Sequence, residues 1–133
     1  EGIDVSPDGK EVWVGNTGDG TIDIIDAASN AIKQSFAVGK VPIRVKFTSD
    51  GKMVLVSDNG AGELIVIDAA SRKVIKRIKA ETAPVGILIV PDVKTAFVAR
   101  SGSGIVSMFD LETLTFSGDI KPGNAPDGMA WVE

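Results

Sequence analysis

Short runs of apolar and β-branched residues alternate with polar or glycine-bearing turns along the whole chain. One stretch reads EVWVGN, then TGDG, then TIDIID, and each apolar run is too short for a typical helix but suits a strand. The basic segment AASRKVIKRIKA is the nearest approach to a helical pattern. Its counterparts elsewhere in the chain contain glycine and β-branched residues at the matching positions, so we read it as a strand too. The pattern predicts an all-β protein.

The same pattern returns every 42 residues, without insertion or deletion. The units are residues 1–42, 43–84 and 85–126, and residues 127–133 match the beginning of a fourth unit. A proline closes each unit, an aspartate ends the third apolar run, and another aspartate lies in the first turn. These residues are Pro42, Pro84 and Pro126, then Asp26, Asp68 and Asp110, then Asp8, Asp50 and Asp92.

Each unit contains four strand-like segments, which is the pattern of a four-stranded antiparallel β-propeller blade. A solenoid of βα units would need a helix in every repeat, and the pattern predicts none. The run Leu64–Ile67 is apolar at every position, as expected of a strand covered on both faces by neighbouring blades. We therefore predict one partial β-propeller domain over residues 1–133. It has three blades and, at residues 127–133, the first strand of a further blade.

The units resemble the repeat of the YVTN family of β-propellers over the whole chain. The turn SPDG is present, Trp13–Asn16 occupies the position of the naming motif, and the G-x-x-P closure stands at Gly39–Pro42 and Gly123–Pro126. The second and third copies of the naming motif are looser, and Glu81 replaces the closing glycine of the second unit.

The resemblance implies a prokaryotic protein of the periplasm or cell surface, and a parent propeller of about seven blades. The family includes surface-layer proteins, periplasmic proteins and relatives of lactonases, amine-dehydrogenase subunits and the haem domain of nitrite reductases. Because a fold does not fix a function, two functions stay open. The first is a non-catalytic binding or scaffold propeller that engages a protein, glycan or small ligand. The alternative is part of an enzyme whose catalytic residues lie in other blades.

Composition narrows the chemistry of this stretch. The net charge is −4 and no Lys/Arg cluster stands out, which argues against a nucleic-acid partner. The chain has no cysteine and no histidine, so it lacks thiolate chemistry, the commonest general base, and the usual ligands of zinc and haem. No apolar run approaches the roughly 20 residues that a membrane span needs. We therefore predict no catalytic residue, no cofactor and no membrane span in this segment.

Three blades alone leave two apolar blade faces open, whereas propellers close with about 4–8 blades. Two interpretations follow. The chain is a piece of a longer propeller, or two copies pair into a ring of six blades. We prefer the first, because residues 127–133 have no role in a self-contained ring. In either case we expect contact between copies through the open blade edges.

A ligand site should break the repeat rather than follow it. One position before the glycine-rich turn does so, with Asn16, Asp58 and Arg100 in successive units. After the closing proline, Asp127 follows two apolar counterparts, and Arg44 interrupts a row of glycines. We predict these five residues as ligand-binding candidates on the face formed by the second-to-third strand turns and the blade links. The arginines suit an anion or carboxylate, and Asp58 could instead pair with one of them.

The aspartates that follow the repeat have a structural interpretation. Asp26, Asp68 and Asp110 precede small polar turns, and a carboxylate there can accept hydrogen bonds from the backbone N–H groups of the turn. The segment NTGDGTID offers oxygen atoms for calcium, but its counterparts lose the acidic residues and it lacks the acidic first position of an EF-hand loop. We predict a hairpin turn there, and no metal site.

Overall fold

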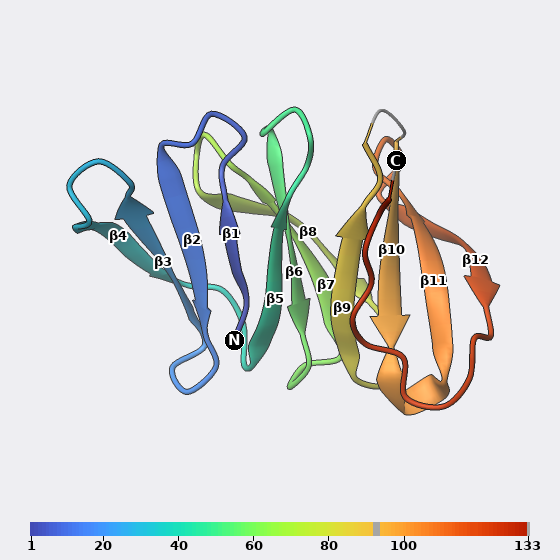
Figure 1. Ribbon diagram of the computed structural model, residues 1–133. Coiled ribbons are helices and arrows are strands. Elements are labelled where there is room, and N and C mark those ends of the chain that lie inside the picture. The colour runs from blue at the N-terminus through green and yellow to red at the C-terminus, as the bar shows by residue number, and fades with distance from the viewer. Residues whose placement is uncertain (92–93, 133) are drawn as a thin grey trace.

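A computed structural model describes residues 1–91 and 94–132, which form three four-stranded antiparallel sheets side by side (Figure 1). We call them blades 1, 2 and 3. The strands of blade 1 are β1 (Ile3–Val5), β2 (Glu11–Asn16), β3 (Thr21–Asp26) and β4 (Ile32–Ala37). Those of blade 2 are β5 (Pro42–Phe47), β6 (Met53–Asp58), β7 (Glu63–Asp68) and β8 (Lys73–Lys79). Those of blade 3 are β9 (Pro84–Ile89), β10 (Thr95–Arg100), β11 (Ile105–Asp110) and β12 (Thr115–Ile120).

The three blades fold alike in detail. Strands pair in chain order within every blade, and the pairing of the third and fourth strands slips once. The slip falls at Ile24/Ile25, Val66/Ile67 and Met108/Phe109, which are 42 residues apart. The basic segment forms strand β8, as predicted. Among the described residues, the only helical element is a short 3₁₀ turn, η1 (Ser101–Ser103), and no helix is long and apolar enough to cross a bilayer.

The glycine-rich segments between the second and third strands are turns. Gly20 has a φ of 68°, and Gly62 and Gly104 repeat this left-handed conformation with φ of 66°. A Cβ at Gly20 would also overlap the carbonyl oxygen of Gly39, so the turn packs directly on the link that leaves the blade. The prediction of a hairpin turn here is therefore confirmed.

The repeated aspartates hold the turns between the third and fourth strands. Asp26 Oδ1 accepts hydrogen bonds from the backbone N–H groups of Ala28 and Ser29, at 3.1 and 2.8 Å. Asp110 does the same for the corresponding turn of blade 3. The backbone hydrogen bond from Ser29, together with its side chain, holds the pKa of Asp26 below its ordinary value. The structural interpretation is confirmed for these residues, while Asp92 of the first-turn row lies outside the described residues.

The core lies between the blades. Two apolar clusters fill the two interfaces, and each takes alternate residues from the facing sheets. The first cluster joins blades 1 and 2 through Trp13, Ile22, Ile24, Val38, Val45, Phe47, Val54, Val56, Ile65, Ile67 and Ala69. The second joins blades 2 and 3 through Leu55, Leu64, Val66, Ile87, Ala96, Val98 and Phe109. The run Leu64–Ile67 contributes to both clusters, which explains why it is apolar throughout.

The structure differs from the prediction of a strand at residues 127–133. The structure assigns no strand to residues 127–132, and Glu133 lies outside the described residues. A strand needs a hydrogen-bonded neighbour, and the described residues supply none for this segment. The segment turns back after β12 and lies against β9, where the backbone of Asp127 occupies the space that a Cβ at Gly86 would fill (Figure 1).

Trp13 anchors the first interface, and its loss should destabilise the fold strongly. The indole is fully buried and makes edge-to-face contacts with Phe36 and Phe47, whose ring centroids lie 5.9 and 5.3 Å away. We expect Trp13→Ala to lower the free energy of unfolding by about 3–5 kcal/mol in urea titrations. Trp131→Ala is the matched control, because that side chain is 50% exposed and its removal should change little. Equal losses in the two variants would contradict this packing.

Candidate functional site

Two of the five predicted site residues meet each other. Arg44 on β5 and Asp127 form an ion pair, with Nη2 lying 3.2 Å from Oδ1 and 3.5 Å from Oδ2. They come from positions 83 residues apart and meet near the inner edges of blades 2 and 3. Both side chains are partly exposed, at 31% and 53%. Arg44 thus already holds a carboxylate, which is the kind of group that the sequence predicts for it.

Asp58 is buried and bound to backbone. Its Oδ2 accepts a hydrogen bond from the N–H of Lys40 at 2.7 Å, and its Oδ1 accepts from Val41 at 2.8 Å and Ala61 at 3.2 Å. Lys40 and Val41 form the link that enters blade 2. Asp58 therefore fixes this link, and an added ligand would have to displace three backbone donors. It pairs with neither Arg44 nor Arg100.

Arg100 holds the link between blades 2 and 3. Its guanidinium donates hydrogen bonds to this link, whereas the carboxylate of Asp58 accepts them from the previous one. Its Nε donates to the carbonyl oxygen of Ala80 at 2.6 Å, and its Nη2 lies 2.6 Å from the carboxylate of Glu81. Nη1 donates to Ser107 Oγ at 3.2 Å, and the guanidinium lies over the ring of Phe116. The side chain is largely buried, so most of its hydrogen-bonding capacity is used within the protein.

These contacts explain why this position breaks the repeat. In the first link, a Cβ at Gly39 would overlap Asp58 Oδ2, so glycine and aspartate belong together. In the second link, Glu81 replaces that glycine and Arg100 replaces that aspartate. The two exchanges compensate each other across an interface. Asn16, the corresponding residue of blade 1, donates from its Nδ2 to Thr21 Oγ1 across its own hairpin.

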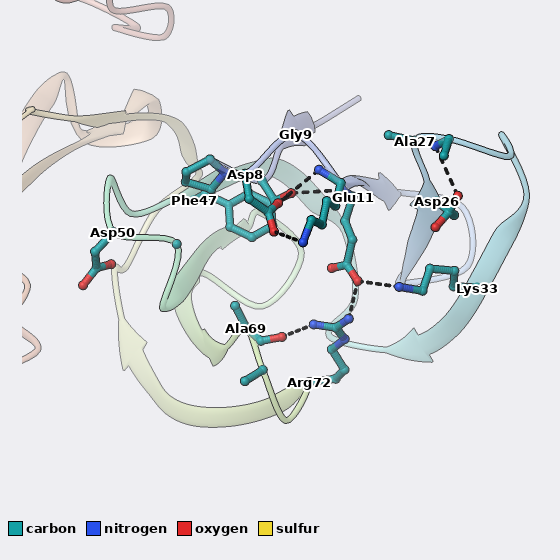
Figure 2. Close-up of a pocket in the computed structure, with 16 residues that line it drawn as sticks. Asp8, Gly9, Glu11, Asp26, Ala27, Lys33, Phe47, Asp50, Ala69 and Arg72 are labelled. Carbon is teal, nitrogen blue, oxygen red and sulfur yellow. Dashed lines mark hydrogen bonds and ion pairs between the residues drawn. The ribbon is translucent and has the colours of Figure 1, made fainter.

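A wide concavity lies on the opposite face, which the sequence analysis did not select. It is an open groove of about 1010 Å³ between blades 1 and 2, bordered by the turns after their first and third strands. We call it the turn groove. Its wall includes small or apolar side chains, and charged side chains stand around them (Figure 2). Its lining includes Pro7, Asp8, Lys10, Glu11, Asp26, Ala27, Ala28, Lys33, Phe47, Asp50, Ala69, Ala70 and Arg72.

Glu11 is the charged centre of this groove. It accepts hydrogen bonds from Trp13 Nε1 at 3.0 Å and Lys33 Nζ at 3.0 Å, and it forms an ion pair with Arg72 from blade 2 (Figure 2). The Arg72 guanidinium also lies 5.4 Å from the centre of the Trp13 ring. Burial by itself would raise the pKa of Glu11. The hydrogen bonds from Trp13 and Lys33 and the charge of Arg72 outweigh that effect, so the pKa lies below its ordinary value.

The equivalent hollow between blades 2 and 3 is smaller, at about 450 Å³. Leu111 and Glu112 line it where Ala69 and Ala70 line the turn groove. The charged pair is also exchanged there, because Met53 stands at the position of Glu11 and Leu114 at that of Arg72. Both of these apolar residues pack against the second core cluster. The turn groove is therefore specific to the first interface, and the small residues at 69 and 70 were the sequence signal for it.

Within residues 1–91 and 94–132, no group of three or more aspartate or glutamate side chains is arranged to hold a metal ion.

Known structures resemble this chain over nearly all of its length. The hydrazine synthase of Kuenenia stuttgartiensis matches with a TM-score of 0.86 and 29% identity, over 92% of this chain and 35% of that one. The U3-55K structure matches with a TM-score of 0.80 and 13% identity, over 89% of this chain and 38% of that one. The RRP9 WD40 repeats match with a TM-score of 0.81 and 14% identity, over 89% and 37%. This chain thus spans little more than a third of each relative.

These matches and the three four-stranded sheets establish an all-β, β-propeller fold. No family model and no curated protein matches the chain. The YVTN resemblance, and the surface or periplasmic location that it implies, therefore stay predictions. The neighbours include an enzyme by name and WD40-repeat propellers, so the fold by itself is compatible with both predicted functions.

The sequence predicts both Asp58 and Asp127 as ligand-binding candidates, but in the structure Asp58 is buried and Asp127 is exposed. We expect Asp58→Ala to lower the free energy of unfolding by about 2–5 kcal/mol, because buried N–H groups lose their acceptor. Asp127→Ala should cost less than about 1 kcal/mol, because its ion pair is half exposed. Chemical denaturation of both variants checks this. A small loss for Asp58→Ala would show that the link does not depend on its carboxylate.

The Glu11 cluster should make the stability depend on pH. Because the pKa of Glu11 is lower in the folded chain than in the unfolded chain, its ionised form stabilises the fold above the ordinary pKa of glutamate, about 4.3. That contribution is lost as the pH falls through the lower, folded-state pKa. We expect Glu11→Gln to be less stable than the parent at neutral pH, and the difference to shrink as the pH falls below about 4. A difference that does not change with pH would contradict an ionised Glu11.

Proposed function

We propose that this chain is the part of a binding β-propeller that holds an extended segment of a partner protein in the turn groove. The observation that carries the proposal is the shape of the groove. It is open, lies between two blades, and is lined by small side chains beside the edge of the buried Phe47 (Figure 2). Ala27, Ala28 and Ala70 are exposed there, so a peptide backbone can approach closely.

Charge around the groove supports a polar peptide rather than a purely apolar ligand. Lys10 is 80% exposed and Lys33 is 46% exposed. Asp8 and Asp50 stand nearby. Hydrogen bonds from Ser6 and Thr48, respectively, hold the pKa values of these two carboxyls below their ordinary value, so both are ionised at neutral pH. Mixed charges around an apolar wall favour an extended segment that carries both signs.

The lowered pKa of Glu11 and its hydrogen bonds within the protein favour binding over catalysis at this groove. A general base near neutral pH needs a raised pKa and free access to a proton. Glu11 has a lowered pKa, and three donors from its own protein hold it. Glu11 therefore joins blades 1 and 2 through its ion pair with Arg72, and it forms part of the groove lining.

A second candidate is part of an enzyme, and the 29% identity with hydrazine synthase favours it. In that case, groups outside this chain would supply the reacting atoms, and this chain would form part of the propeller around them. The two candidates differ in what a groove variant does, because binding of a peptide to this chain alone needs no group from elsewhere.

Selection of peptides on this chain tests the first candidate. We expect a phage-displayed library of random peptides of about 12 residues to yield binders with micromolar dissociation constants. Filling the groove with Ala27→Trp or Ala70→Trp should weaken them at least tenfold, measured by isothermal titration calorimetry. Both alanines are exposed, so the variants should fold.

Ala61→Trp is the matched control. Ala61 is also exposed, but it lies in a glycine-rich turn on the opposite face. Binding that survives the groove variants and is lost in Ala61→Trp would move the partner to the face that the sequence predicts. A failure of every peptide to bind would overturn the proposal.

A further inference from the structure

The fourth strand of blade 2 is an open edge that concentrates positive charge. Strand β8 pairs with β7 on one side, and the described residues supply no strand for its other side. Blade 2 lies between blades 1 and 3, so this is the edge of an internal blade with a neighbour on each face (Figure 1). Four of the seven residues of β8 are basic, and all four are exposed: Lys73, Lys76, Arg77 and Lys79.

This charge is specific to blade 2. Strands β4 and β12 are the matching edges of blades 1 and 3, but β4 carries one basic residue, Lys33, and β12 carries one acidic residue, Asp119. The whole chain has a net charge of −4, so the cations of β8 stand against the overall charge. Lysine on an open edge commonly prevents unwanted strand pairing. If that were its only role here, β4 and β12 would need it equally.

Most of the charge on β8 is not neutralised within the protein. Arg77 forms an ion pair with Glu63 on β7, with Nη1 lying 3.4 Å from Oε2. Among the described residues, no carboxylate lies within ion-pair distance of Lys73, Lys76 or Lys79. These three ammonium groups are therefore available to a partner.

The cations flank the edge on both faces of the blade. Lys76 Nζ donates to the carbonyl oxygen of Leu114 in blade 3, at 3.0 Å. Arg77 Nη2 donates in the opposite direction, to the carbonyl oxygen of Val38 at 2.7 Å, in the link that leaves blade 1. Side chains alternate along a strand, so Lys79 shares the face of Arg77. A strand added to this edge would meet positive charge on both of its faces.

Aliphatic side chains lie between these cations. Val74 is 37% exposed and Ile75 is 49% exposed. The slip in the β7–β8 pairing leaves Ile75 without a partner on β7. An added strand can cover this apolar surface as well as the charge, whereas the phosphates of a nucleic acid or a lipid headgroup would meet the charge alone.

We propose that β8 binds an acidic, extended segment of a partner protein as a fifth strand of blade 2. The free backbone groups of the edge supply hydrogen bonds to any added strand, and the cations select an acidic one. The same cations repel a second copy of β8. Directly opposite side chains on paired strands lie close together, so acidic residues should face the four basic ones, and aliphatic residues should face Val74, Ile75 and Ile78. No residue of β8 lines the turn groove, so this proposal does not rest on peptide binding there.

Binding of a designed peptide to this chain tests the proposal. In antiparallel pairing, the capped peptide EVEEVVE places glutamate opposite each basic residue of β8 and valine opposite each aliphatic one. By fluorescence anisotropy we expect a dissociation constant of about 100 µM at low salt. The affinity should fall at least fivefold at about 500 mM salt, because the charges are exposed. The lysine counterpart, KVKKVVK, should not bind.

The peptide backbone separates strand addition from attraction between charges. N-methylation of both central glutamates of the peptide keeps its charge. Successive N–H groups of a strand point in opposite directions, so one of the two blocked groups would face β8. Binding should weaken at least tenfold. Saturation with the unmodified peptide should also slow amide hydrogen exchange in β8 but not in β4 or β12. Equal binding of the methylated peptide would overturn strand addition.

Variants of the chain locate the contact. Lys73→Gln/Lys79→Gln should weaken binding at least fivefold. Lys10→Gln/Lys52→Gln is the matched control, because it removes the same charge from two turn lysines that are 80% and 81% exposed. Neither this control nor Ala70→Trp in the turn groove should change the affinity. Circular dichroism should show that every variant keeps the fold. Equal weakening by the two lysine pairs, tighter binding of phosphatidylserine vesicles or single-stranded DNA than of the peptide, or no binding of the peptide would overturn the proposal.

Discussion

The packing of one blade face on another is the interaction on which the rest of this structure depends. A four-stranded blade has no core of its own, because its strands form a single layer. Its apolar side chains are buried only by the next blade, and the two clusters of this chain lie entirely at such contacts. Turns, links and ion pairs all serve to bring the faces together at the right spacing. The middle blade is therefore the best buried, since it alone among the described blades has a neighbour on both sides.

The fold was predictable because the repeat carries redundant information. Three copies of each signal agree, so the basic segment of β8 was read as a strand through its counterparts, against its own appearance. The segment at 127–132 had no such support in the structure. Its sequence is that of a strand, but strand formation depends on hydrogen bonds to a neighbour, and sequence alone does not supply one.

The site was harder to predict, and for a physical reason. A break in the repeat marks a residue whose surroundings differ between copies, whether those surroundings are a ligand or another part of the chain. At Asp58 and Arg100 the changed surroundings are the links that these side chains hold. The turn groove arises from the opposite kind of signal, a loss of side-chain volume at Ala69 and Ala70. That signal can be read only by comparing Ala69 and Ala70 with Leu111 and Glu112 of the next repeat and by knowing that these turns border the same kind of hollow.

The exchange of Glu11 and Arg72 for Met53 and Leu114 has a consequence for how the chain avoids misfolding. Nearly identical repeats can dock in the wrong order during folding, because their apolar faces are interchangeable. If blade 3 were to dock on blade 1, Leu114 would face Glu11, and the carboxylate would lose its ion pair with Arg72 and keep only Lys33 in a partly buried site. The first interface thus carries a charged pair where the second carries an apolar pair. The mismatched pair would make the wrong order less stable than the native one, while the apolar faces supply the attraction common to every pairing.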